Sequence, residues 1–177
     1  MRIISGYLKG RQFEGPKGHR THPMSEKARG GLFNTLGNID DLTLLDAFAG
    51  SGALSFEAIS RGAKHVTAID IDRSAINSVV KGAKELGIDD KLHAIRANAS
   101  GWSDLNSGKT FDIALVAPPY DDLQLKLLQK LARHTKPGGI YVLDWPGNLE
   151  MPEIEGLKML KQKVYGDAQL VFYRRIQ

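Results

Sequence analysis

Short apolar runs alternate with amphipathic segments along most of this chain. From residue 42 onward, the apolar runs predict strands at 42–46, 65–70, 91–96, 111–116 and 139–144. Helical spacing falls between them near 51–61, 73–86 and 121–134, and we expect the last helix to end at Lys136-Pro137-Gly138-Gly139. Nearly continuous apolar strands that alternate with helices indicate a parallel sheet covered on both faces, hence a doubly wound α/β fold.

The two ends of the chain depart from this alternation. Near the C-terminus, apolar segments at Leu157–Val164 and Gln169–Arg174 flank Tyr165-Gly166-Asp167, which predicts an antiparallel edge of the sheet. Residues 1–24 hold short apolar pieces interrupted by glycines, a pattern typical of a hairpin with extended turns. Ser25 has the side chain of a helix N-cap, and apolar residues follow it at helical spacing.

Length and composition fit a single domain. The chain has 177 residues, of which 42% are hydrophobic and 25% are charged, so it can bury a core of its own. We expect one domain over 1–177, made of a basic N-terminal hairpin or arm at 1–24, a first helix at 25–38 and a Rossmann-like core at 42–177.

Several classes of protein are disfavoured by what the sequence lacks. No apolar run approaches the roughly 20 residues that span a bilayer, and the first residues lack the apolar stretch of a secretory signal. The absence of cysteine excludes disulfides and thiolate metal sites and suits a reducing cytoplasm. The five histidines are scattered without paired ligand spacing, so we expect no metal. The expectation is a cytoplasmic monomer with no membrane partner.

Positive charge is concentrated at the N-terminus. Residues 1–29 hold seven Lys or Arg side chains and two acids, whereas the other 148 residues hold 17 basic and 18 acidic side chains. Such a block favours a polyanion such as RNA through phosphate neutralisation, although a solvated basic surface has the same sequence. The expected phosphate contacts are Arg2, Lys9, Arg11, Lys17, Arg20 and Arg29.

A glycine-rich turn after the first strand of the core carries the strongest chemical signal. Asp46 ends the strand, and Gly50 and Gly52 let the backbone turn tightly and a ligand approach closely. The next helix directs free N–H groups at the turn, which suits a carboxylate, while Ser55 breaks the dinucleotide pattern Gly-x-Gly-x-x-Gly. Asp70 ends the second strand at the spacing of an acid that binds ribose hydroxyls. Together these features predict a site for S-adenosylmethionine; the alternative is a plain strand-loop-helix turn.

Asn98, which follows the third strand, is the expected contact on the adenine side of this predicted site. Its amide oxygen can accept a hydrogen bond from the adenine amine, although an ordinary turn asparagine has the same local sequence. The expected cofactor contacts are Asp46, Phe48, Gly50, Ser51, Gly52, Asp70, Ile71 and Asn98.

The fourth strand of the core ends in a motif suited to a flat base. Pro118 and Pro119 make a rigid lip with free carbonyls, and Tyr120 offers a ring on which a base can stack. Methylation of an exocyclic amine also needs an acceptor that orients its lone pair, and Asp or Asn before the prolines would supply one. Ala117 stands there instead, so we expect a catalytic corner of Ala117, Pro118, Pro119 and Tyr120 whose rate is limited at Ala117.

These residues together make the chain similar to a known family. Arg2-Ile-Ile-Ser-Gly6, Leu32-Phe33-Asn34, the block from Phe48 to Ala63, Pro118-Pro119-Tyr120 and Tyr165-Gly166-Asp167 occur in the same order. In these motifs the chain resembles the RsmD-type family of bacterial 16S ribosomal RNA methyltransferases, which methylate the 2-amino group of one guanine.

The resemblance implies a class I methyltransferase fold, S-adenosylmethionine as donor, and 16S RNA or the assembling small subunit as partner. It adds Asn34 and His22 to the expected RNA contacts, His22 in a segment where the family usually has Arg-Pro-Thr. Ala117 and Asn98 each replace an acid that is usual in the family. Two other functions stay open: a non-catalytic ribosome-assembly factor that binds S-adenosylmethionine and RNA, and a DNA amino-methyltransferase.

Overall fold

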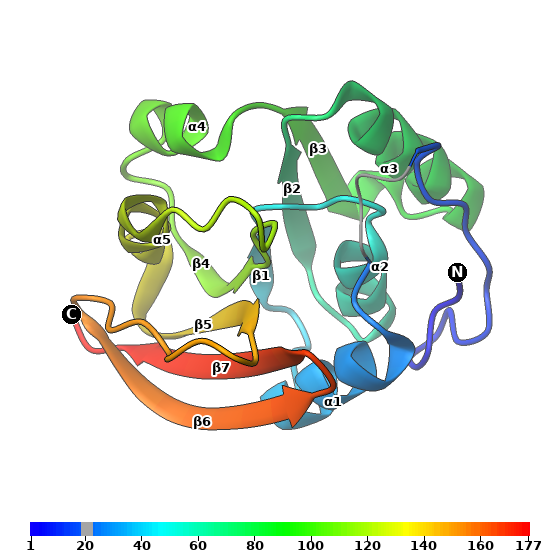
Figure 1. The fold of residues 1–177 in the computed structure, drawn as a ribbon. Coiled ribbons are helices and arrows are strands. Elements are labelled where there is room, and N and C mark those ends of the chain that lie inside the picture. Colours follow the sequence, from blue (N-terminus) through cyan, green and yellow to red (C-terminus); the bar gives the residue numbers. More distant parts are fainter. Residues whose placement is uncertain (19–22) are drawn as a thin grey trace.

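A seven-stranded sheet forms the centre of the computed structural model, which describes residues 1–18 and 23–177 (Figure 1). The strand order is β3-β2-β1-β4-β5-β7-β6, with β1 to β5 parallel to one another and β7 antiparallel to both β5 and β6. The predicted doubly wound sheet with an antiparallel edge is therefore confirmed. The strands are β1 (Thr43–Asp46), β2 (His65–Asp70), β3 (Leu92–Arg96), β4 (Phe111–Val116), β5 (Thr135–Pro146), β6 (Leu157–Tyr165) and β7 (Ala168–Arg175).

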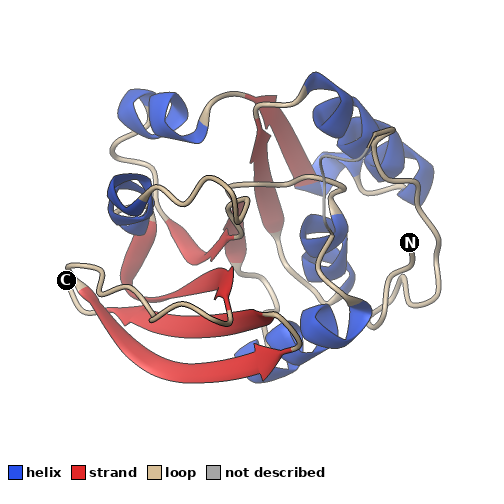
Figure 2. Cartoon of the chain, in the orientation of Figure 1, coloured by secondary structure: helices blue, strands red, loops and turns tan. Residues whose placement is uncertain are grey.

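Helices cover both faces of this sheet (Figure 2). One apolar cluster packs α1, α2 and α3 against the sheet and includes Ile3, Leu8 and Phe13 of the N-terminal segment. A second cluster packs α4 and α5 against the opposite face. The helices are α1 (Glu26–Leu36), α2 (Ala53–Ser60), α3 (Arg73–Leu86), α4 (Ala99–Leu105) and α5 (Leu125–Ala132), with a short 3₁₀ turn at Asp89–Lys91.

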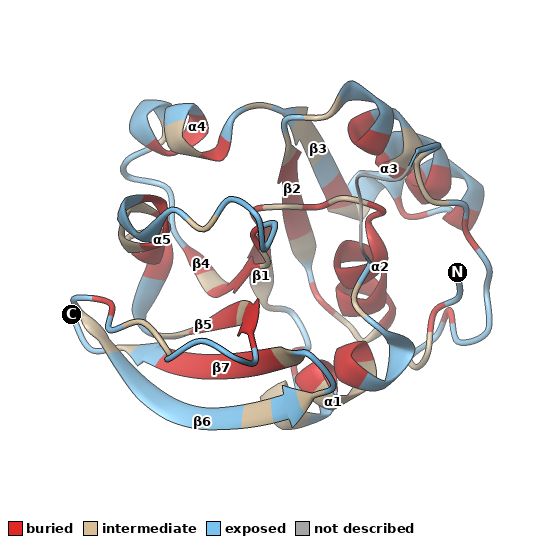
Figure 3. Ribbon diagram, viewed as in Figure 1, coloured by how far each residue is buried: buried red, intermediate tan, exposed pale blue. Residues whose placement is uncertain are grey.

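Burial follows the order of the strands. The middle strands are buried along most of their length, whereas β6 is largely exposed (Figure 3). A central parallel strand has a helix layer on each face, so both of its faces need apolar side chains. In the described parts of the chain, no helix is long and apolar enough to cross a membrane.

The fifth strand of the sheet begins earlier than its apolar pattern predicts. The expected helix end at Lys136–Gly139 is wrong, because α5 ends at Ala132 and residues 136–139 lie within β5. Phe111 of β4 pairs with Thr135, but Ile113 pairs with Ile140, so these four residues loop out of the ladder as a bulge. Pro137, which has no N–H to donate, is tolerated at such a position.

Helix α4 is absent from the sequence-based expectation. Its sequence Ala-Ser-Gly-Trp-Ser-Asp-Leu has a weak helical pattern, and tertiary contacts stabilise it. Asn98 caps its first turn, and Trp102 is buried beside Phe111 and His134.

The N-terminal segment is integrated into the fold. Arg2 and Gln12 form a single antiparallel bridge, so the expected hairpin is present as one bridge and not as two strands. Ile3, Leu8 and Phe13 are almost fully buried, and the Phe13 ring meets Phe56 of α2 edge to face at 5.0 Å. The basic residues of this segment are thus presented by a fixed backbone.

Candidate active site

The expected site residues meet where the strand order reverses. β1 lies between β2 and β4, with Asp46 in register with Ala68 on one side and Leu115 on the other. Ligands of open α/β sheets bind beyond the carboxyl ends of strands at such a switch point. The glycine turn after β1, Asp70 at the end of β2 and Ala117 just beyond β4 therefore share one edge of the sheet (Figure 1).

The glycine turn has a backbone that other residues rarely adopt. Gly50 and Gly52 have φ angles of 52° and 82°, and Gly52 is the N-cap of α2 without any side-chain cap. A Cβ on Gly52 would lie 3.0 Å from the Phe56 ring and 3.1 Å from Val79. Helix α2 begins directly after the turn at this edge of the sheet, and a helix N-terminus is a favourable place for a carboxylate.

Asp70 fixes the position of this turn. One of its carboxylate oxygens accepts from the N–H of Gly50 at 2.8 Å, and the other accepts from the N–H of Asp72 at 2.8 Å. Each carboxylate oxygen has a second lone pair, so ribose hydroxyls can still donate to it. Ile71 follows with 64% of its surface exposed, an apolar group beside the predicted nucleoside position.

Asp46 is a buried acid with one unsatisfied oxygen. Its Oδ2 accepts from the Ser55 hydroxyl at 2.7 Å, while Oδ1 is buried and has no hydrogen-bond partner of ordinary geometry among the described residues. Burial raises the pKa of Asp46 to about 6, the Ser55 hydrogen bond opposes that rise, and the nearby charge of Asp70 adds to it. A cationic ligand group at Oδ1 would satisfy this oxygen and stabilise its charged form. The residues present therefore fit an amino-acid ammonium group.

Of the remaining turn residues, Ser51 lies against the N-terminal segment, and Phe48 packs against the apolar cluster that contains α4 and α5. Ser51 is buried and its hydroxyl accepts from the N–H of Ala53, whereas Phe48 is partly buried. Gly15 packs against Ser51: a Cβ on Gly15 would lie 3.6 Å from the Ser51 Cβ. Residues around Gly15 thus lie directly against the predicted cofactor turn.

Asn98 is the N-cap of α4, a structural role that its local sequence also fits. Its side-chain oxygen accepts from the N–H groups of Ser100 and Gly101 at 3.0 and 3.2 Å, which caps α4. The expected contact from this oxygen to adenine would have to share it with the cap. The adenine contact stays a prediction.

Beside the expected catalytic corner lies an acid that the sequence analysis missed. Pro118 is buried, while Pro119 and Tyr120 are exposed, and the Tyr120 hydroxyl donates to Asp144 Oδ1 at 2.5 Å. Asp144 lies in β5, in an apolar run that otherwise reads Ile-Tyr-Val-Leu. An acid near the carboxyl end of a strand was the signal used for Asp46 and Asp70, and the same signal could have found it. Burial and the Asp144 hydrogen bond raise the pKa of Tyr120, and burial raises that of Asp144.

Four of the expected phosphate contacts are exposed. Lys9, Arg11 and Lys17 lie on the surface of the N-terminal segment, and Arg11 also donates to the backbone oxygen of Glu85. Arg2 is exposed as well, but it makes two-oxygen contact with Glu26, which neutralises part of its charge. Asn34 is exposed on α1, where its side-chain oxygen accepts from Arg61.

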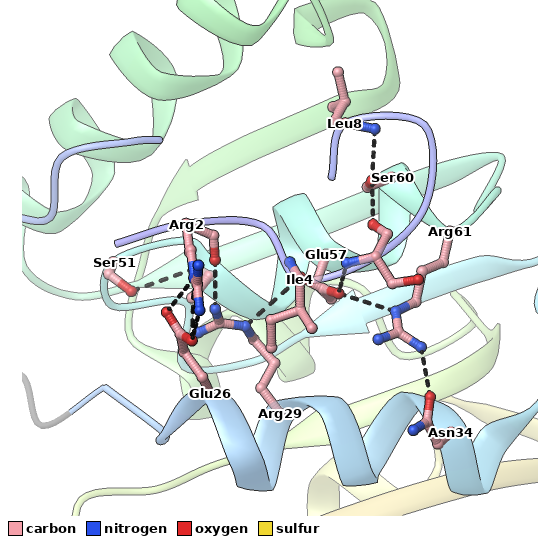
Figure 4. A network of polar contacts seen from close by, with 12 residues as sticks. Arg2, Ile4, Leu8, Glu26, Arg29, Asn34, Ser51, Glu57, Ser60 and Arg61 are labelled. Carbon is pink, nitrogen blue, oxygen red and sulfur yellow. Dashed lines mark hydrogen bonds and ion pairs between the residues drawn. The ribbon is translucent and has the colours of Figure 1, made fainter. Parts of the chain in front are cut away.

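The expectation that Arg29 contacts RNA is wrong, because the structure buries this side chain. It is 2% exposed, donates to the backbone oxygen of Arg2 at 2.6 Å and lies 3.7 Å from the fully buried Glu57 (Figure 4). A buried guanidinium cannot reach phosphate, so Arg29 belongs to the core. Its place on the inner side of α1 was not visible from charge counting alone. Arg20 and His22 lie outside the described residues, so their roles remain predictions.

Comparisons with known proteins identify the relatives of this fold. A protein-family model described as Conserved hypothetical protein 95 matches residues 1–174. The Bacillus subtilis "Putative rRNA methyltransferase YlbH" is 32% identical over 182 residues, which cover 99% of each chain. "Ribosomal RNA small subunit methyltransferase D" of Buchnera aphidicola is 36% identical over 135 residues, 76% of this chain and 70% of its own. A solved Escherichia coli structure, "Putative methyltransferase yhhF", has a TM-score of 0.88 and 28% identity, and the match covers 99% of this chain and 97% of that one.

The sheet order and the structural likeness define a class I S-adenosylmethionine-dependent methyltransferase fold. Within that class, the chain belongs to the family described as Conserved hypothetical protein 95, to which the RsmD-type RNA methyltransferases belong. The family expected from the sequence is therefore confirmed.

Proposed function

We propose that this chain transfers a methyl group from S-adenosylmethionine to the exocyclic 2-amino group of a guanine in the 16S RNA of the small ribosomal subunit. For a chain of this family, one structural observation supports the proposal most strongly. The glycine turn and the lip of Pro118 to Tyr120 follow neighbouring parallel strands, β1 and β4, so a donor and a base would meet at one edge.

Three parts of the donor have a group of fitting chemistry in the chain. Asp46 Oδ1 would hold its ammonium group, the N-terminus of α2 its carboxylate, and Asp70 its ribose hydroxyls. When bound, S-adenosylmethionine supplies an electrophilic methyl group. Tyr120 would stack on the target base, a contact worth about 1–3 kcal/mol.

The RNA would approach over the N-terminal segment. Lys9, Arg11 and Lys17 are exposed on the segment that packs against the cofactor turn through Gly15. Phosphates held there would lie beside the donor site, which supports RNA over a small-molecule substrate.

Mass spectrometry of 16S RNA from cells with and without this gene tests the proposal. We expect a single N2-methylguanosine that disappears with the gene and returns when the purified chain and donor are added to the unmethylated subunit or its RNA. The Tyr120→Ala variant should restore it more slowly. A methyl group on another base, or none on any ribosomal RNA, would contradict the proposed function.

A second function is favoured by Ala117. A chain without a side-chain acceptor before the prolines is suited to binding S-adenosylmethionine and RNA during ribosome assembly without methylating. In that case calorimetry would detect binding of both ligands, while a single-turnover assay with labelled donor would detect no transfer.

A further inference from the structure

Asp144 stands beside the position from which the expected acid is missing. Leu115 pairs with Val142 and Val116 with Leu143 in the parallel ladder of β4 and β5. Continuing that register by one residue brings Ala117 level with Asp144. Register partners on adjacent parallel strands present their side chains to the same face, about 5 Å apart. A carboxylate on residue 144 can therefore serve the space that a carboxylate on residue 117 would serve.

Tyr120 holds the Asp144 carboxylate in place. Its hydroxyl donates to Asp144 Oδ1 at 2.5 Å and lies 3.2 Å from the backbone oxygen of Trp145. Among residues 1–18 and 23–177, no hydrogen bond reaches the other carboxylate oxygen, Oδ2. One oxygen is thus tied to the ring on which the base would stack, and the second remains available as an acceptor.

We propose that Asp144 is the residue that accepts from the target amine in this chain, taking the part for which Ala117 has no side chain. This inference rests on the proposed methyl transfer to guanine. Asp144 Oδ2 would accept one N–H of the 2-amino group, which directs the nitrogen lone pair away from the carboxylate and toward the donor. Tyr120 would fix both the base, by stacking, and the acid, by its hydroxyl.

The group-transfer step balances with the groups named. The amine lone pair forms the new N–C bond as the S–C bond of the sulfonium breaks, and that bonding pair stays on sulfur, which becomes neutral. The methylated nitrogen carries the positive charge and loses one proton to Asp144 Oδ2. The carboxylic acid later returns this proton to water. Burial favours the protonated form of Asp144 and so raises its pKa, which suits a proton acceptor.

Substitution of Asp144 in the full chain tests the inference. Asp144→Ala should reduce single-turnover methylation of the unmethylated subunit by roughly 10²–10³-fold, the usual effect of removing one positioned hydrogen-bonding group. Calorimetry with S-adenosylhomocysteine should show affinity within about twofold of the unsubstituted chain. Asp122→Ala is the matched control, since Asp122 is an exposed acid two residues after Tyr120 whose carboxylate accepts from the Gln124 side chain.

A second substitution separates the two acceptor positions. Ala117→Asp should recover much of the lost rate in the Asp144→Ala background and add little to the unsubstituted chain. If Ala117 limits the rate, as the sequence alone suggested, Ala117→Asp would instead raise the rate in both backgrounds. That outcome would overturn the role of Asp144.

Two pH measurements distinguish an acceptor from a merely structural contact. The single-turnover rate should rise with pH as Asp144 ionises, and Asp144→Asn should lack that limb of the profile. Independently of activity, NMR of ¹³C-labelled tyrosine should show that Asp144→Asn lowers the pKa of the Tyr120 phenol.

The failures of the two inferences are distinguishable. An active unsubstituted chain whose rate is unchanged in Asp144→Ala would overturn the role of Asp144 and leave the proposed function standing. An unsubstituted chain that methylates no ribosomal RNA, while Tyr120 still responds to Asp144→Asn, would overturn both. In that case the Tyr120–Asp144 pair has a structural role only.

Discussion

Three acids near the carboxyl ends of three parallel strands have different environments and different chemistry. Asp46 is buried with one unsatisfied oxygen, Asp70 holds two backbone N–H groups, and Asp144 is tied to a tyrosine at the catalytic corner. Their sequence signal is the same, an acid after an apolar run. Burial and hydrogen-bond partners suit the first two to ligand binding and the third to proton acceptance.

Asp46→Asn should change how stability depends on pH. Burial raises the pKa of Asp46 from 3.8 to about 6, so the folded state binds more protons than the unfolded state between these values. The charged carboxylate therefore costs stability increasingly as pH rises from 4 to 6, by up to about 3 kcal/mol above pH 6. Relative to the unsubstituted chain, Asp46→Asn should gain stability over that interval. Urea unfolding at pH 4 and pH 8 measures the free energy of unfolding of each variant. Asp121→Asn, a change at an exposed acid, is the control. The prediction is contradicted if the stability difference between Asp46→Asn and the unsubstituted chain is the same at both pH values.

Asp70→Ala should weaken binding of S-adenosylhomocysteine. The variant loses charged hydrogen bonds to the ribose, worth about 1.5–3 kcal/mol each, as well as the tie to the Gly50 N–H. Asp70→Asn keeps one acceptor without the charge, so its affinity for S-adenosylhomocysteine should lie between those of the unsubstituted chain and Asp70→Ala. Calorimetry measures all three affinities. Equal values would remove Asp70 from the cofactor site.

At the scale of elements, one buried carboxylate joins the N-terminal segment, α1 and α2. Glu57 of α2 accepts from the N–H groups of Ile4 and Ser5 at 2.9 and 3.0 Å and pairs with Arg29 and Arg61 (Figure 4). The side chains of Glu57 and Arg29 are almost fully buried. Removing one partner of such a network leaves the other charge without compensation.

Glu57→Ala should destabilise the fold by about 3–5 kcal/mol, because it leaves Arg29 buried and unpaired and frees two backbone N–H groups. Hydrogen exchange should show that the amides of Ile4 and Ser5 lose protection. Glu26→Ala is the control: its pair with Arg2 is exposed, so the free energy of unfolding should barely change. Similar losses in the two variants would show that Glu57 is not the anchor of the segment.

At the scale of the whole molecule, charge is distributed unevenly around the donor site. The excess of basic residues lies in the first part of the chain, and the structure places its exposed members on a segment that packs into the core beside the cofactor turn. Binding of RNA to such a surface depends on salt through the number of phosphates neutralised.

Replacing Lys9, Arg11 and Lys17 together by Gln should weaken binding to 16S RNA and flatten its dependence on salt. Each phosphate that the variant no longer neutralises should reduce the slope of log affinity against log salt by roughly 0.7 to 0.9. The matched control replaces Lys109, Lys158 and Lys161, exposed residues that lie before β4 and on β6. Fluorescence anisotropy at several salt concentrations gives the slopes. If both triple variants show the same slope, the N-terminal segment is an ordinary solvated surface.

Local pattern was sufficient for most of the fold, and it also gave a prediction of where the site lies. Apolar runs bounded by polar residues predicted the five parallel strands, because a strand covered on both faces needs apolar side chains throughout. The positions of the glycine turn and of Asp70 were predictable because both depend on local sequence: the glycines allow the tight turn, and the acid directly ends an apolar strand. Helix α4 and the bulge at 136–139 were missed, since packing of Trp102 and pairing with β4 determine them.

Burial and partners could be assigned only once distant segments were brought together. Arg29 and Arg2 are both basic residues of the N-terminal block, yet α1 turns Arg29 toward the buried Glu57, whereas Arg2 lies on the surface of the N-terminal segment. Asp144 lies 27 positions from Ala117 along the chain, and the parallel register of β4 with β5, continued by one residue, brings the two positions level. Composition and motifs describe which groups are present. The long-range register of the sheet determines which of them meet, because it is fixed by contacts between residues that no local window contains.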